Sequence, residues 1–154
     1  MAGDDQAGSI RSILVATDGS AAADEALERA LELAEQTGAA VHVLAVVDAT
    51  TNPMHFGVDD IGELQQTRER LVDDLVATAG DRDVEIQSAI RRGRPATVIL
   101  TYADEHAIDM VIVGRTGRSR VADMLLGSTT DRLVREASVP VVVVPETKTD
   151  DGDE

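Results

Sequence analysis

The sequence predicts an α/β fold: an open five-stranded parallel sheet with helices on both faces. Two observations predict it. Short apolar runs rich in valine and isoleucine alternate with longer segments whose apolar residues recur at helical spacing. The short runs are almost continuously apolar, which is typical of strands that are covered on both faces rather than on one.

The first half of the chain predicts two strands and two helices. A strand over 12–17 is followed by a helix over 20–38 and by a second strand over 40–48. A polar stretch over 49–61 predicts a long loop. The helix after it ends near Gly80 and is expected to turn four apolar residues inward: Leu64, Leu71, Leu75 and Val76.

The second half predicts three strands and two helices. Strands over 84–90 and 110–114 flank a helix over 95–106 that has proline in its first turn. A helix over 127–137 and an apolar strand over 139–145 complete the fold. That last helix is expected to bury three residues on one face: Leu133, Val134 and Ala137.

Length and composition indicate a single cytoplasmic domain. We expect it to cover 10–145, with acidic, disordered tails over 1–9 and 146–154. The amino end does not resemble a signal peptide, and no apolar run approaches the ~18 residues that span a bilayer. The absence of cysteine excludes disulfides and thiolate metal sites.

The net charge of −15 argues against general binding to nucleic acid or to anionic membranes, because it repels their phosphates. Lys148 is the only lysine among 14 basic residues, and the chain has one Phe, one Tyr and no Trp. This composition is typical of halophilic proteins, in which salt screens the repulsion between dense carboxylates. The alternative is an acidic mesophilic protein from a GC-rich genome.

Unusual residues stand at the carboxyl ends of two predicted strands. The strand over 12–17 runs into Asp18-Gly19-Ser20, and the strand over 110–114 runs into the sequence GRTGR. In open α/β sheets, ligands bind beyond the carboxyl ends of the strands, where the strand order reverses. We therefore expect the order 3-2-1-4-5, which makes these strands neighbours, rather than a flavodoxin-like 2-1-3-4-5 order.

Three features after the fourth strand predict a phosphate site. Gly114 and Gly117 can adopt positive φ, which lets successive N–H groups converge on an anion. The sequence GST at 127–129 begins a helix, whose first N–H groups favour negative charge. The stretch 110–122 has no acidic residue but has arginines at 115, 118 and 120. The alternative is structural: a turn, a helix cap, and arginines paired with surface carboxylates.

The spacing Gly114-x2-Gly117-x9-Gly127-Ser128 resembles the nucleotide loop of the universal stress protein family. The resemblance covers about residues 10–145, and four more motifs carry it: ILVATDGS at the first strand, GRP at 93–95, DMVIVG at 109–114 and VPVVVV near the end. It implies a Rossmann-like fold of the adenine nucleotide alpha hydrolase type. For the ATP-binding branch of the family, it also implies a bound ATP or related adenine nucleotide, with Mg²⁺ or Mn²⁺.

The resemblance also assigns the site residues. Ala16 and Thr17 would wall the nucleoside, and Asp18 would approach the ribose or a metal-bridged phosphate. Val46 would present backbone groups to the adenine, and Val113 would contact the ribose side. Seven residues would cradle the phosphates: Gly114, Arg115, Gly117, Arg118, Gly127, Ser128 and Thr129. Two positions depart from the family pattern: Ala16, where proline is common, and Arg115-Thr116, where Ser-His is frequent.

Other nucleotide and nucleic-acid motifs are missing or out of place. The chain has no GxxxxGK[ST] P-loop, and no GxGxxG loop follows its first strand. A GxxG loop also occurs in KH domains, where it clamps RNA. Here it follows a buried strand of a parallel sheet, and the net charge opposes RNA.

The resemblance implies a regulatory module of the stress response, and no catalytic residue is predicted. Histidines at 42, 55 and 106 show no spacing typical of a Ser-His-Asp set or a metal cluster. Two alternatives remain: a slow ATP hydrolase, and a nucleotide-independent interaction module of the same fold. Arginines at 91, 92 and 94 form either a solvated rim or a contact for a nucleotide or partner.

The final strand predicts a homodimer. In the order 3-2-1-4-5 it lies at the edge of the sheet, and soluble proteins rarely leave an apolar edge open. Pro140 and Pro145 limit pairing to Val141–Val144, which would pair with its copy across a two-fold axis. A monomer whose edge is covered by a tail or a helix is the alternative.

Overall fold

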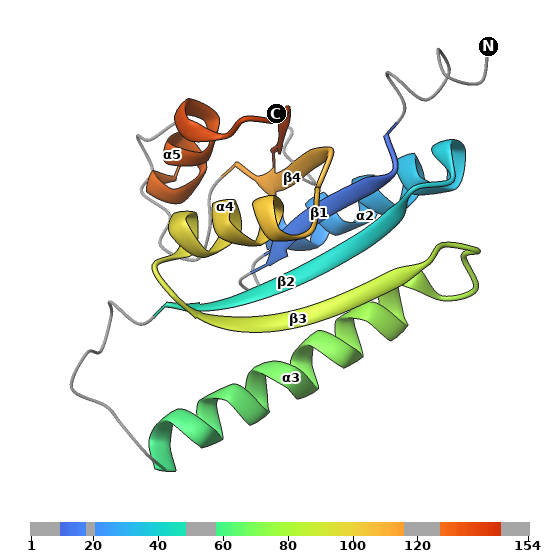
Figure 1. The fold of residues 1–154 in the computed structure, drawn as a ribbon. Coiled ribbons are helices and arrows are strands. Elements are labelled where there is room, and N and C mark those ends of the chain that lie inside the picture. Colours follow the sequence, from blue (N-terminus) through green and yellow to red (C-terminus); the bar gives the residue numbers. More distant parts are fainter. Residues whose placement is uncertain (1–9, 18–20, 49–57, 116–126, 146–154) are drawn as a thin grey trace, which may run out of the picture.

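The computed structural model describes residues 10–17, 21–48, 58–115 and 127–145. Its strands are parallel and form one sheet in the order β3-β2-β1-β4-β5 (Figure 1). The predicted order 3-2-1-4-5 is therefore confirmed. In chain order the strands are β1 Ser12–Thr17, β2 Ala40–Asp48, β3 Ile86–Gly93, β4 Met110–Gly114 and β5 Val141–Val144.

The helices of the described part cover both faces of this sheet (Figure 1). They are α2 Ala21–Thr37, α3 Val58–Ala79, α4 Pro95–Glu105 and α5 Ser128–Glu136. One core lies between the sheet and the pair α2 and α3, and includes Ile13, Val15 and Leu71. The other lies under α4 and α5 and includes Leu14 and Leu133. Successive residues of β1 enter opposite cores, which is why this strand is apolar throughout.

Two residues predicted to be buried are exposed instead. Val76 in α3 is 70% exposed, and Val134 in α5 is 47% exposed. Consecutive residues of an α-helix project about 100° apart around its axis. Because Leu75 and Leu133 face the cores, the residue after each of them turns away from the sheet.

Several element bounds differ from those predicted. The helix α3 begins at Val58, inside the stretch 49–61 that was expected to be a loop. The strand β3 starts later than predicted and continues to Gly93. The strand β5 begins only after Pro140, which has no N–H; its carbonyl oxygen accepts from the Val111 N–H at 3.0 Å. The predicted tails, 1–9 and 146–154, lie outside the described residues.

Asp109 fixes the amino ends of the two central strands relative to each other. Its Oδ2 accepts the N–H groups of Arg11 and Ser12 at 2.9 and 3.1 Å. Its own N–H donates to the carbonyl oxygen of Ser12 at 2.9 Å. Because β1 and β4 run parallel, their carboxyl ends reach the same edge of the sheet.

Among the described residues, no helix has the length and hydropathy to cross a membrane.

Candidate functional site

The predicted site residues at the ends of β1 and β4 lie side by side. The two strands pair in register, with Val15 opposite Ile112. Ala16 and Thr17 therefore end β1 beside Val113, and all of them lie at the carboxyl edge of the sheet. The chain continues from β1 to β2 on one side, whereas β4 lies on the other side. This reversal is the position at which open α/β sheets bind ligands.

Gly114 is needed for close packing rather than for the positive φ that was predicted. Its backbone is not among the positive-φ glycines of the described residues. A Cβ at this position would lie 2.7 Å from the Cβ of Ala22 and 2.8 Å from its carbonyl carbon. Only a residue without a side chain lets the first turn of α2 approach the end of β4 so closely. Gly117, the other glycine of the prediction, lies outside the described residues.

Two hydrogen bonds join the end of β4 to the start of α5, and a third joins it to β5. The Arg115 N–H donates to the Val144 carbonyl oxygen at 2.8 Å, and its carbonyl oxygen accepts the Gly127 N–H at 2.9 Å. The Thr130 Oγ1 donates to the carbonyl oxygen of Gly114 at 2.9 Å. We call Gly114, Arg115, Gly127 and Thr130 the β4–α5 junction. It brings Arg115 and Gly127 together although residues 116–126 separate them in sequence.

Thr130 is the residue of this site that the sequence prediction missed. It is 5% exposed, whereas Ser128 is exposed and Thr129 is half-buried. The signal that could have found it is its helical spacing to Leu133, because residues three apart share a face of a helix. Ser128, Thr129 and Thr130 all carry hydroxyl groups, but only Thr130 shares the buried face of α5 with Leu133. Its hydroxyl is therefore the one that bonds to the end of β4.

Among the described residues, no carbonyl group accepts the N–H groups of the first turn of α5. Gly127 is its N-cap and supplies no side-chain cap. Within the described part of the chain, the first helical N–H bonded to a carbonyl is that of Asp131, which donates to Gly127 at 2.8 Å. The carboxylate of Asp131 pairs with Arg135 at 3.1 Å. The N–H groups before Asp131 and the helix dipole therefore favour an anion at this position.

The remaining predicted residues fall into two groups. Val46 is half-buried and follows Ala45, the β2 residue that pairs with Thr17. It therefore lies at the same edge of the sheet. Its strand, β2, is separated from β4 by β1. Arg115 is exposed directly after β4. Asp18 and Arg118 lie outside the described residues, as Gly117 does.

Of the arginines at the end of β3, Arg91 is not simply part of a solvated rim. The Arg91 Nη1 donates to the Glu105 Oε1 at 2.9 Å, and its guanidinium lies 5.0 Å from the centre of the Tyr102 ring. Arg94 is exposed and precedes the first residue of α4. Among the described residues, no three histidine or acidic side chains are close enough to hold a metal ion.

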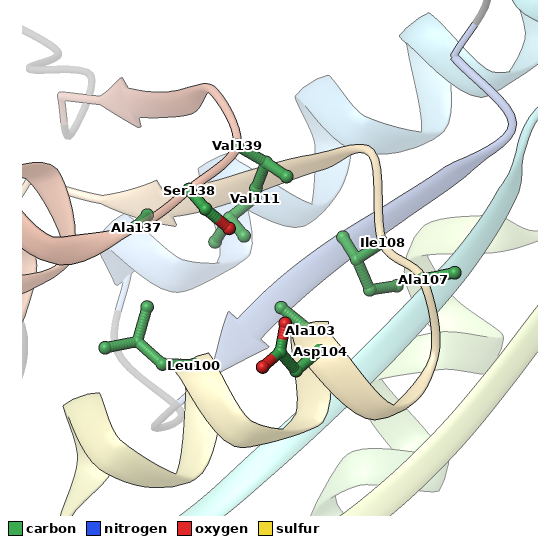
Figure 2. Close-up of a pocket in the computed structure, with 9 residues that line it drawn as sticks. All are labelled: Leu100, Ala103, Asp104, Ala107, Ile108, Val111, Ala137, Ser138 and Val139. Atoms are coloured by element: carbon green, nitrogen blue, oxygen red, sulfur yellow. The ribbon is translucent and has the colours of Figure 1, made fainter.

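A separate hollow lies at the opposite end of β4 (Figure 2). Its volume is about 110 Å³, below the ~300 Å³ at which ligand pockets begin. Figure 2 shows α4 on one side of it and the segment before β5 on the other. It is lined by Leu100, Ala103, Asp104, Ala107, Ile108, Val111, Ala137, Ser138 and Val139. A nucleotide does not fit there, so the hollow is not an alternative location for the predicted site.

Comparison with known proteins shows the family of the chain. The universal stress protein family model matches residues 9–145. The chain belongs to the universal stress protein family. It is 29% identical to a universal stress protein of Methanocaldococcus jannaschii over 142 residues, covering 90% of this chain and 84% of the relative. It is also 29% identical to one of Bacillus subtilis over 144 residues, covering 86% and 97%.

Solved structures of universal stress proteins share the fold. The UspA protein of Lactobacillus plantarum is 27% identical, with a TM-score of 0.78 over 89% of this chain and 99% of its own. Two more distant structures were solved with ligands. One, a complex with cAMP, is 23% identical with a TM-score of 0.62 over 91% of this chain and 100% of its own. The other, from Archaeoglobus fulgidus in complex with dAMP, is 22% identical with a TM-score of 0.63 over 87% and 97%.

Proposed function

We propose that this universal stress protein binds ATP or a related adenine nucleotide and acts as a regulatory module of the stress response in the cytoplasm. The observation that carries the proposal is the β4–α5 junction, which holds an uncapped helix start beside the carboxyl end of a central strand. Backbone N–H groups at such a helix start stabilise a phosphate. The cAMP and dAMP complexes of two relatives support an adenine nucleotide as the ligand class.

In this proposal the ligand lies along the carboxyl edge of the sheet. Its phosphates contact Ser128 and Thr129 and lie beside Gly114 and Gly127. Its nucleoside runs from Val113 past Ala16 and Thr17, and its adenine reaches the backbone of Val46. Neighbouring parallel strands are ~4.8 Å apart, so a path from β4 across β1 to β2 is about 10 Å long. That length suits an adenine nucleotide.

Residues outside the described part complete the proposed site. Gly117 and Arg118 are expected to add N–H groups and a positive charge to the phosphate contacts. Asp18 is expected to bind the ribose or, through phosphate or water, a Mg²⁺ or Mn²⁺ ion. Both ions prefer oxygen ligands and commonly reach proteins through phosphate oxygens. Arg115, where the family often has serine, is exposed and adds a further positive charge beside the phosphates.

We also infer that the protein is adapted to high salt. Seven ion pairs are formed among the described residues, most of them on exposed surface, and many carboxylates remain in excess. Exposed pairs contribute little to stability, about 0–1 kcal/mol each. They therefore do not offset the repulsion that a net charge of −15 produces. Screening by salt reduces this repulsion instead.

We propose in addition that the protein forms a homodimer through the edge strand β5. Val142 is 37% exposed, whereas Val144 is buried. β5 bonds to β4 along one side, and no described strand pairs with its other side. An antiparallel pair with the same strand of a second copy would close both open edges.

Paired variants in ATP titrations test the proposed site. Gly117→Val is expected to abolish binding, because a β-branched residue resists positive φ and blocks close approach of a phosphate. Asp18→Ala is expected to weaken binding more with Mg²⁺ than without it. Gly62→Val and Asp81→Ala, both at exposed positions that the proposal gives no role, are the controls. Normal ATP binding by both site variants would contradict the proposed location.

The parent protein distinguishes the two alternative functions. If it does not bind ATP, a nucleotide-independent interaction module is favoured. If it releases ADP in the presence of ATP, a slow hydrolase is favoured.

A further inference from the structure

Three aromatic and imidazole rings meet between α4 and the sheet, away from the proposed nucleotide site. His42 comes from β2 and is 6% exposed; Tyr102 and His106 come from α4 and its C-cap. The Tyr102 and His106 rings are stacked with centres 3.8 Å apart. The centre of the His42 ring lies 5.6 Å from each of the other two. We call these three residues the ring cluster.

Hydrogen bonds tie the ring cluster together. The Nδ1 of His42 and the Tyr102 hydroxyl are 2.8 Å apart. The Nδ1–H of His106 donates to the carbonyl oxygen of Tyr102 at 3.1 Å. The bond between His42 and Tyr102 links β2 to α4 directly. With Tyr102 as donor, His42 must accept through an unprotonated Nδ1.

Charged groups surround the ring cluster on two sides. From β3, the Arg91 guanidinium lies over the Tyr102 ring, and the Glu85 carboxylate, just before that strand, acts on His42. From α4, Glu105 pairs with Arg91 at 2.9 Å. Burial lowers the pKa of His42, the nearby His106 lowers it further, and Glu85 opposes both effects. Burial also raises the pKa of the Tyr102 hydroxyl, while Arg91 opposes that change.

Protonation of His42 would change the contact that links β2 to α4. A proton on the Nδ1 of His42 turns the acceptor for the Tyr102 hydroxyl into a second donor. It also puts a positive charge in an apolar core beside His106. Glu85 is exposed, so water screens the attraction that it offers. The hydrogen bond that Tyr102 donates therefore requires a neutral His42.

We propose that the ring cluster is a pH-sensitive contact that holds α4 on the sheet when the His42 imidazole is neutral and loosens it when that imidazole takes up a proton. The sign follows from the lowered pKa of His42. As pH falls below the ordinary value of 6.5, the unfolded or loosened chain takes up the proton first. The contribution of the cluster to stability is complete above about pH 6.5 and decreases as the pH falls below it.

Amide hydrogen exchange of the full chain in high salt, without any nucleotide, tests the proposal. Exchange is compared at about pH 7.5 and about pH 5.5, after correction for intrinsic rates, and α2 is the internal reference. We expect the protection of α4 relative to α2 to fall by about tenfold on acidification. The non-titrating His42→Gln and His106→Gln double variant should lose that difference, and His55→Gln, the third histidine, should keep it. Persistence of the α4-specific response in the double variant would overturn the proposal.

A second measurement does not depend on the variants folding. Proton NMR of the wild-type chain follows the imidazole resonances through a pH titration. We expect the His42 resonance to titrate below 6.5, together with changes in the Tyr102 ring signals. A His42 resonance that titrates at or above 6.5, with Tyr102 unchanged, would contradict the proposal. Because no ligand is involved, either result leaves the proposed nucleotide binding untouched.

Discussion

The hydroxyl of Thr130 donates a hydrogen bond to the carbonyl oxygen of Gly114 across 2.9 Å, from a side chain that is 5% exposed. This bond fixes the first turn of α5 to the end of β4. The N–H groups at the start of α5 are thereby held beside the ends of the two central strands. We therefore expect this contact to orient the proposed phosphate site.

Replacing Thr130 tests that dependence. Thr130→Val keeps the shape but leaves the Gly114 carbonyl oxygen without its donor. It should lower the free energy of unfolding by about 1–3 kcal/mol and weaken ATP binding. Thr130→Ser, which keeps the hydroxyl, should restore binding. Thr129→Val at the half-buried neighbouring position is the control for stability. Chemical denaturation and ATP titration give the two readouts. A Thr130→Val protein with parental stability and affinity would contradict this role.

Gly114→Ala tests the close approach between β4 and α2. The added Cβ would lie 2.7 Å from the Ala22 Cβ, so either strand or helix must shift. Overpacking of this kind costs about 1–3 kcal/mol. Gly62→Ala in α3 is the matched control, because a Cβ there meets nothing within 4 Å and should raise stability by ~0.5–1 kcal/mol. Equal stability changes for the two variants would show that the Ala22 contact is not limiting.

Much of the fold follows from the sequence because its signals are local. Apolar runs and their spacing predicted every strand and helix of the described part, and the unusual residues after β1 and β4 predicted their adjacency. The direction of single side chains was harder to predict. Val76 and Val134 are apolar at near-helical spacing, but the sheet selects Leu75 and Leu133 and turns the next residues outward.

Contacts between distant segments were beyond a reading of the sequence alone. Gly114 fitted both a positive φ and a close approach, and only the position of Ala22 decides between them. Similarly, the histidines at 42 and 106 seemed unrelated by spacing. They lie near each other because Tyr102 and His106, one helical turn apart on α4, both reach the face of β2 that carries His42.

Salt should stabilise the protein. The chain has 29 acidic residues against 14 basic ones, and the Debye length falls from about 30 Å at 0.01 M to about 3 Å at 1 M. Thermal melting from dilute buffer to about 1 M KCl should therefore show a rising melting temperature. Equal or lower melting temperatures at high salt would remove the inference of adaptation to salt.

Val142→Lys tests the proposed dimer at the β5 edge. A buried lysine at a two-fold interface faces its own copy, so like charges should separate the subunits. Val142 suits the test better than Val143, which packs against the core under α4 and α5. Val134→Lys, an exposed valine on α5, is the matched control. Light scattering in high salt should report a dimer for the parent and control and a monomer for Val142→Lys. A monomeric parent, or a variant that stays dimeric, would exclude this interface.

Calorimetric titration of ATP into protein freed of copurified nucleotide, in high salt with Mg²⁺, tests the central proposal most directly. The wild-type chain should bind ATP with a dissociation constant on the order of micromolar, equivalent to about −8 kcal/mol. The same titration of Thr130→Val should show weaker binding. No heat with ATP, ADP or AMP across several salt concentrations, from protein shown to be folded, would contradict nucleotide binding at the carboxyl ends of β1 and β4.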